Sequence, residues 1–216
     1  MYYYCERTSA DIFSEPFNSL TNLAFIFISY LIFKKYKNYK NGLIFSGLIF
    51  CIGLGSFLLH TIPSKITALI DVIFILFFII FFLYILYKNV LKTKIIYALF
   101  ISFVSPVVYF YLGSSLKENF PLFGDSSFYI VILLNLILIY FYLLIKNTNF
   151  SNYILIASII FLISIFFRII DQVYCDINFY GTHFLWHILN SLVLFYLVRF
   201  SISNLYFHPK NTNQVL

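Results

Sequence analysis

Three histidines, a serine and an aspartate lie in otherwise apolar stretches of this sequence. His183 and His187 are four residues apart, and Ser56 precedes His60 by the same interval, so on helices each pair shares a face. Asp71 follows His60 by eleven residues. Polar side chains in a bilayer are costly, so they usually face a bundle interior and mark a site. Three imidazoles suit zinc with a fourth position open to water, and we interpret the set as a membrane-embedded metal hydrolase site.

The composition indicates an integral, multi-pass membrane protein. The chain is 62% hydrophobic and 10% charged, with a mean hydropathy of +0.94, which excludes a soluble domain. Its apolar segments approach the ~20 helical residues that cross a bilayer. We expect an all-α bundle of seven transmembrane helices forming a single domain over residues 1–216. The predicted spans are 18–33, 42–60, 66–87, 94–112, 127–145, 153–171 and 182–202.

The basic residues predict the orientation. One side of the predicted membrane carries Lys34, Lys35, Lys37, Lys40, Lys88, Lys92, Lys94, Lys146, Arg199 and Lys210, and the other carries Arg7, Lys65 and Lys117. Cytoplasmic loops hold the excess of Lys and Arg, so we expect the N-terminus outside and the C-terminus in the cytosol. The net charge of +6 therefore reflects topology and lipid head groups rather than a nucleic-acid surface.

The same topology brings the polar residues to one depth. The ends of spans two, four and six and the starts of the other four all lie on the outer side. The residues that converge there are Glu15, Ser56, His60, Asp71, Arg168, Asp171, His183 and His187. Residues scattered for unrelated reasons would not all choose one leaflet. We therefore prefer a site to the alternative, in which helix-end histidines sit at the interface and bind nothing.

Ser56 and Asp71 each have two interpretations. Ser56 is either a hydrogen-bond donor to a developing oxyanion or a small residue that, after Gly53 and Gly55, allows close helix packing. The sequence favours neither. Asp71 either takes a proton from water at the metal and passes it to a leaving amine, which we favour, or orients a histidine.

The remaining polar residues have plainer interpretations. Arg168 and Asp171 are three apart on the sixth predicted span, so we expect an ion pair, with contact to head groups or to the N-terminal segment as the alternative. Cys5 and Cys175 both fall outside, where disulfides persist. Cys51 lies within the second span and is expected to serve packing.

Motifs over nearly the whole chain resemble those of one family. They are residues 4–6 (YCE), residues 15–22 (EPFNSLTN), Gly55-Ser56 with His60 and Asp71, residues 181–187 (GTHFLWH), and also Arg168, Asp171 and Cys175. The chain thus resembles the alkaline ceramidases, seven-helix membrane zinc amidases of the superfamily that includes the adiponectin receptors.

The resemblance implies zinc on His60, His183 and His187, with Ser56 and Asp71 assisting. It implies a membrane lipid substrate, ceramide or a similar N-acyl lipid, cleaved to a sphingoid base and a fatty acid. The acyl chain would lie in an apolar cavity between helices. The resemblance also implies a disulfide between Cys5 and Cys175.

Family members bind calcium through an acidic N-terminal loop, and here the match is partial. Glu6 and Glu15 remain. Tyr3 stands where an aspartate is expected, Thr8 stands where an asparagine is expected, and the loop is shorter. These departures argue against a complete calcium site.

Two rival functions belong to other classes. A receptor-like or vestigial seven-helix protein would hold structural zinc, but three histidines without a fourth ligand favour a catalytic site. A proton-coupled transporter would use Asp71 and the histidines as a relay. The sequence has no internal repeat or paired broken helices, which argues against the transporter.

Overall fold

The protein is a helical bundle. The structure is a computed structural model that describes residues 4–9 and 11–207, and these ranges contain no strand. Seven of its helical segments are long and apolar enough to cross a membrane, which confirms the predicted fold class. The elements are α1 (Pro16–Thr21), α2 (Leu23–Tyr36), α3 (Lys40–Thr61), α4 (Lys65–Ile85), η1 (Leu86–Val90), α5 (Ile95–Asn119), η2 (Pro121–Ser126), α6 (Ser127–Ile145), α7 (Asn152–Tyr174) and α8 (His183–Tyr206).

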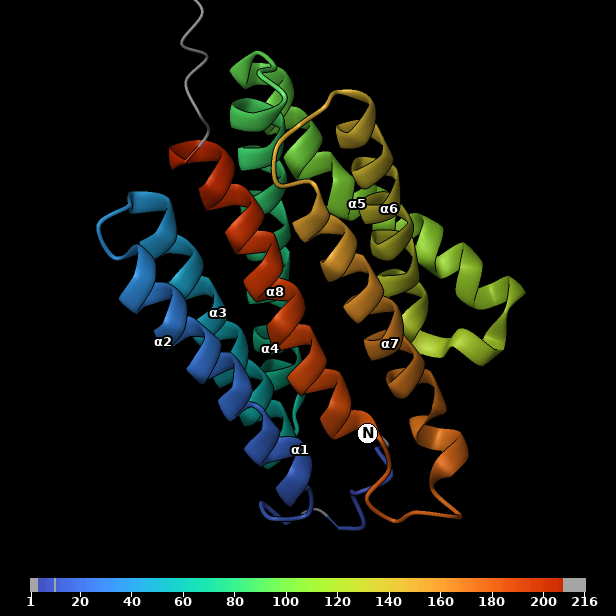
Figure 1. Cartoon of the computed structure of the whole chain (residues 1–216). Coiled ribbons are helices and arrows are strands. Elements are labelled where there is room, and N and C mark those ends of the chain that lie inside the picture. Colours follow the sequence, from blue (N-terminus) through green and yellow to red (C-terminus); the bar gives the residue numbers. More distant parts are fainter. Residues whose placement is uncertain (1–3, 10, 208–216) are drawn as a thin grey trace, which may run out of the picture.

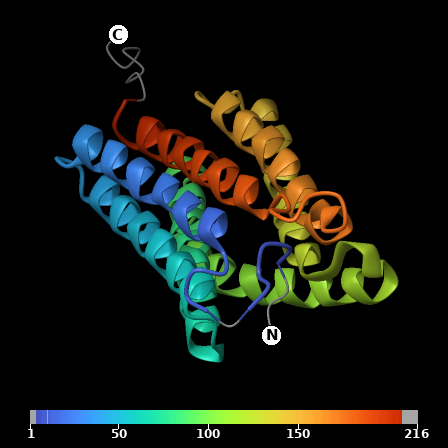
Figure 2. The same ribbon diagram turned by 90° about the horizontal axis from the view of Figure 1, so that it is seen from below.

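Helix α8 runs through the middle of the bundle. It lies between the α2–α3 pair on one side and α7 on the other, and both views show this order (Figure 1, Figure 2). Helix α4 packs behind α3 and α8, and α5 and α6 complete the far side. Helix α1, the α3–α4 connection and the start of α8 all lie at one end (Figure 1). That end gathers most of the polar residues singled out above.

The helices extend beyond the apolar segments that predicted them. The clearest case is α5, which continues through the polar residues 113–119 to Asn119, whereas the predicted span ended at Leu112. Hydropathy marks where a chain leaves an apolar environment, and a helix can continue into water past that point. The bounds of a span and the bounds of a helix are therefore different quantities.

Hydrogen bonds and glycines fix how closely the helices approach. The hydroxyl groups of Ser29 on α2 and Ser46 on α3 each donate to the other residue's carbonyl, at 2.9 and 3.0 Å. Such bonds hold helices together where no water competes. On α3, a Cβ added at Gly53 would lie 2.8 Å from Cβ of Phe25, and one added at Gly55 would lie 3.2 Å from Cα of Asp71 on α4. Gly55 thus lets α4 approach the turn of α3 that carries Ser56.

The glycines of α3 give a matched test of this packing. We predict that Gly55→Val lowers the free energy of unfolding by about 1–3 kcal/mol, because the added side chain meets the backbone of α4. Gly47→Val is the control, since a Cβ there meets nothing within 4 Å and the helix-propensity change is the same. Thermal unfolding in detergent measures both variants, and equal losses would contradict the close α3–α4 contact.

Candidate metal centre

The structure brings His60, His183 and His187 together at the polar end of the bundle. His60 lies in the last turn of α3, and His183 and His187 lie in the first turns of α8. One ligand atom from each histidine lies within 4.8 Å of the other two, and all three side chains are buried. The i, i+4 spacing and the burial of the α8 N-terminus against α3 together create this cluster.

In two of the histidines, Nδ1 has a hydrogen-bond partner that orients the ring. Nδ1 of His60 lies 2.6 Å from a carboxylate oxygen of Glu15. Nδ1 of His187 lies 3.0 Å from the hydroxyl oxygen of Thr21, which donates its own proton to the carbonyl of Phe17. In the tautomer in which Nδ1 donates to these oxygens, Nε2 of each ring keeps a free lone pair. Metal-ligating histidines are oriented in this way by carboxylates and carbonyls.

The donor set fits a divalent metal ion. Nδ1 of His183 is buried and has no hydrogen-bond partner among the described residues. An unpaired buried imidazole nitrogen is costly, and coordination of a metal through Nδ1 of His183 would offset that cost. Three neutral imidazoles leave a tetrahedral metal with one open position.

Asp171 fixes the start of α8, and the ion pair predicted between Asp171 and Arg168 is wrong. No such pair occurs among the described residues. One carboxylate oxygen of Asp171 accepts from the backbone N–H groups of Thr182 at 2.7 Å and His183 at 2.9 Å. The first N–H groups of a helix lack internal partners, and Asp171 supplies one from α7. Its carboxylate is thus committed to positioning the helix that carries His183 and His187.

Arg168 instead faces the aromatic wall of the cavity. Its guanidinium lies 5.0 Å from the ring centre of Trp186 and 5.3 Å from that of Tyr129. Cation–π contacts of this kind stabilise a desolvated arginine. Arg168 also interacts electrostatically with Tyr4 and Asp71, so the predicted alternative of contact with the N-terminal segment is the better description.

The N-terminal segment covers the histidines. The ring of Tyr4 stacks on His183 with centroids 4.0 Å apart and lies 4.8 Å from the ring of His60. Next to it, a disulfide joins Cys5 to Cys175 at the end of α7. Gly181, at φ +61°, is required there, because an added Cβ would lie 2.3 Å from the Asp171 carboxylate and 2.6 Å from Cβ of Cys5.

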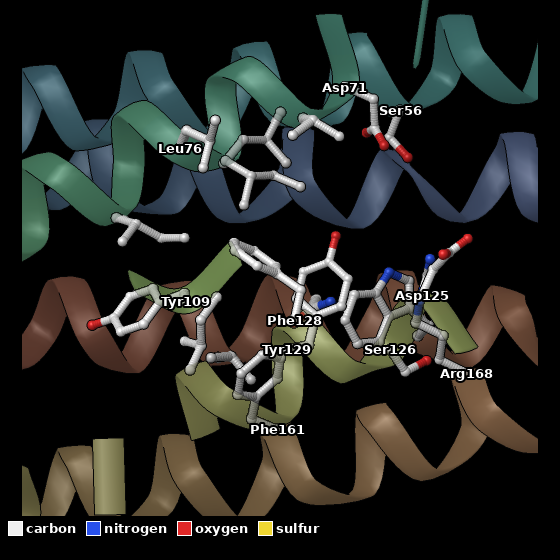
Figure 3. Close-up of a pocket in the computed structure, with 18 of the residues that line it drawn as sticks. Ser56, Asp71, Leu76, Tyr109, Asp125, Ser126, Phe128, Tyr129, Phe161 and Arg168 are labelled. Carbon is white, nitrogen blue, oxygen red and sulfur yellow. The ribbon is translucent and has the colours of Figure 1, made fainter. Parts of the chain in front are cut away.

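Ser56 and Asp71 lie next to the histidines on the wall of one large cavity. Their side-chain oxygens point toward each other, and the Ser56 hydroxyl interacts with the Asp71 carboxylate (Figure 3). The cavity has a volume of about 1110 Å³, and all three histidines line it. Away from this end the wall is mostly apolar, with Leu76, Phe128 and Phe161 among its side chains (Figure 3). A polar site therefore opens into an apolar chamber.

The two acidic residues named for calcium also reach this site. Glu15 contacts His60, and Glu6 accepts hydrogen bonds from the backbone of α1 at Phe17 and Asn18. Thr8 is exposed, and Tyr3 lies outside the described residues.

Sequence reasoning missed three contributors to the site, namely Arg7, Thr21 and Tyr4. Arg7 pairs with Glu15 and donates to the His60 carbonyl at 2.9 Å. All three belong to the N-terminal loop or the short α1, where no helical spacing links them to the ligands. Only the fold of the loop over the bundle end brings them into contact with histidines.

A seven-helix bundle with a buried trihistidine cluster and a large cavity defines a class of membrane proteins with an internal site that can hold a metal ion. The sequence matches the model of the Ceramidase family over residues 2–215. The chain belongs to this family and is an integral, multi-pass membrane protein of ceramidase-like hydrolase type. Comparison with curated protein sequences gave no match.

The metal centre predicts stoichiometric binding of one divalent ion. We expect His60→Ala, His183→Ala and His187→Ala each to remove most of it, because each leaves only two ligands. Elemental analysis of purified protein measures the ratio, with Cys51→Ala, which lies outside the cluster, as the control for folded yield. Full metal retention in the His183→Ala/His187→Ala variant would refute the centre.

The disulfide ties the N-terminal segment to the end of α7 across 170 residues of sequence. We expect Cys5→Ser and Cys175→Ser to lose similar stability, on the order of 4–5 kcal/mol in a chain-entropy treatment. Cys51→Ser, which removes the free thiol, should lose little. Peptide mass mapping without reductant tests the bond directly, and free thiols at both positions would disprove it.

Proposed function

We propose that this protein is a zinc-dependent membrane amidase that hydrolyses the N-acyl amide of ceramide or a similar lipid to a sphingoid base and a fatty acid. The observation that carries the proposal is the position of the trihistidine cluster, Ser56 and Asp71 at the polar end of an otherwise apolar cavity. A lipid amide is likewise polar at one end and apolar along the rest, because its head carries the amide bond that reacts and its chains are apolar. Membership of the Ceramidase family supports the same substrate class.

Three histidines would hold the zinc, and His60 and His187 would bind through the nitrogens left free by Glu15 and Thr21. When bound, zinc polarises the amide carbonyl and lowers the pKa of water at the site. The choice of zinc rests on the all-imidazole donor set and its open fourth position.

Asp71 acts as the proton carrier. Glu15 and Thr21 contact Nδ1 of His60 and of His187, whereas the Asp71 carboxylate faces the cavity. It accepts a proton as water attacks the amide carbon, and it returns the proton to the nitrogen when the C–N bond breaks. Arg168 balances the negative charge of Asp71 from the same end of the cavity.

Ser56 donates a hydrogen bond to the oxyanion that forms on the amide oxygen. The alternative role, close helix packing, belongs to Gly55, whose absent side chain admits α4. Ser56 lines the cavity instead, one residue further along α3. A pre-positioned donor in a site of low dielectric stabilises developing charge strongly.

Substitutions at Asp71 and Ser56 separate chemistry from metal binding. We predict that Asp71→Asn keeps zinc and the fold but loses nearly all amidase activity, because an amide cannot accept the water proton. Ser56→Ala should lose roughly 10²–10³-fold in rate, as for one oxyanion donor. The assay is turnover of a lipid amide in mixed micelles, with zinc content measured on each variant.

Val107→Ala is the control. It shortens an apolar side chain that lines the cavity and leaves the histidines, Ser56 and Asp71 unchanged. Loss of zinc together with activity in Asp71→Asn would make Asp71 a ligand or an orienting residue. Retention of both would refute the proposed mechanism.

A further inference from the structure

The N-terminal loop buries two carboxylates beside the metal centre. Glu6 and Glu15 are each 1% exposed. A buried charge is tolerated only when it is paired or hydrogen-bonded. The resemblance described above implies calcium as the compensating ion for this loop, so the partner of each carboxylate oxygen decides whether calcium fits.

Both oxygens of Glu6 are taken by backbone groups. One accepts from the N–H of Phe17 at 2.6 Å, and the other accepts from the N–H of Asn18 at 2.8 Å. Burial raises the pKa of Glu6, and these two hydrogen bonds work against that increase. The carboxylate therefore closes the first turn of α1, and each of its oxygens already accepts a backbone hydrogen bond.

Both oxygens of Glu15 are taken by side chains. One pairs with Nε of Arg7. The other lies 2.6 Å from Nδ1 of His60 and 3.0 Å from the side-chain amide of Asn18. Glu15 therefore already has a positively charged partner in Arg7.

Arg7 contacts His60 from two directions. Through Glu15 it reaches the imidazole, and its Nη2 donates directly to the backbone carbonyl of His60 at 2.9 Å. Its Nη1 donates to the carbonyl of Ser9 at 3.1 Å. One largely buried guanidinium therefore joins the loop, the ligand's backbone and the carboxylate that orients the ligand's ring.

We infer that Arg7 is a built-in cation that replaces calcium in this loop and acts as a positioning residue for the metal ligand His60. Calcium takes six to eight oxygen ligands, whereas Glu6 is held by the backbone of α1 and Glu15 already has a positively charged partner in Arg7. The guanidinium suits the task because its planar fork donates in several fixed directions at once. A lysine would keep the charge but would not make the bonds to Glu15 and to the His60 carbonyl together.

The inference rests on the metal centre and not on the proposed amidase reaction, so its test uses zinc affinity. We expect Arg7→Ala to weaken zinc binding about 10–100-fold, the range for loss of a group that orients a metal ligand. Arg7→Lys should fall between Arg7→Ala and the unsubstituted protein. Competition with a chromophoric chelator measures the affinity, and melting temperature is recorded in parallel. Lys117→Ala is the control, because it removes a cation from an exposed ion pair with Asp125 and should leave zinc affinity unchanged.

A double variant tests the route from Arg7 to His60. If Arg7 acts through Glu15, then Arg7→Ala/Glu15→Gln should weaken zinc binding by clearly less than the product of the two single losses. A lower melting temperature in Arg7→Ala with zinc affinity within twofold of the unsubstituted protein would overturn the positioning role. If Arg7→Ala does not fold, Arg7→Lys and Glu15→Gln carry the same comparison.

Calcium binding tests the other half of the inference. Equilibrium dialysis of the zinc-loaded protein should find no saturable calcium site up to about 1 mM, the weak end of protein calcium sites. One bound calcium ion per chain at lower concentration would overturn the replacement of calcium by Arg7. Neither result depends on whether ceramide or any other amide is turned over.

Discussion

The cost of leaving a polar group unpaired inside an apolar bundle governs the whole site. His60, Glu15 and Arg7 form an unbroken chain of contacts from the buried ligand to the loop that covers it. Asp171 performs the equivalent task for His183 by accepting from the first N–H groups of α8. Each ligand-bearing helix end is thus held by a carboxylate from another part of the chain. These hydrogen-bonded carboxylates, Glu15 and Asp171, hold the helix ends at which the histidines converge.

The same constraint explains why the N-terminal segment is part of the functional architecture. Tyr4 covers two histidine rings, and the neighbouring disulfide anchors the segment to the end of α7. Gly181 removes the side chain that would block this approach. The opposite side of the site is open to the cavity, from which the lipid substrate proposed above would reach the histidines. Polar closure on one side and apolar access on the other suit a reaction on the head of a lipid.

Much of this arrangement was predictable from sequence, and the failures share one physical cause. Hydropathy predicted seven helices, and the spacing of His183 and His187 predicted a shared helix face, because both depend on local periodicity. The orientation in the membrane stays a prediction. Arg168 and Asp171 were expected to pair because they are near in sequence, yet each finds a better partner on another element. Arg7 and Thr21 carry no periodic signal, since their contacts depend on how the N-terminal loop and the short α1 pack against the end of the bundle.

X-ray absorption spectroscopy at the zinc edge on the purified protein tests the central claim most directly. The account predicts one zinc with three imidazole nitrogens at about 2.0–2.1 Å and a single further oxygen ligand, which leaves a position for water or substrate. A sulfur ligand at about 2.3 Å, a fourth imidazole, or the absence of zinc from active protein would contradict it.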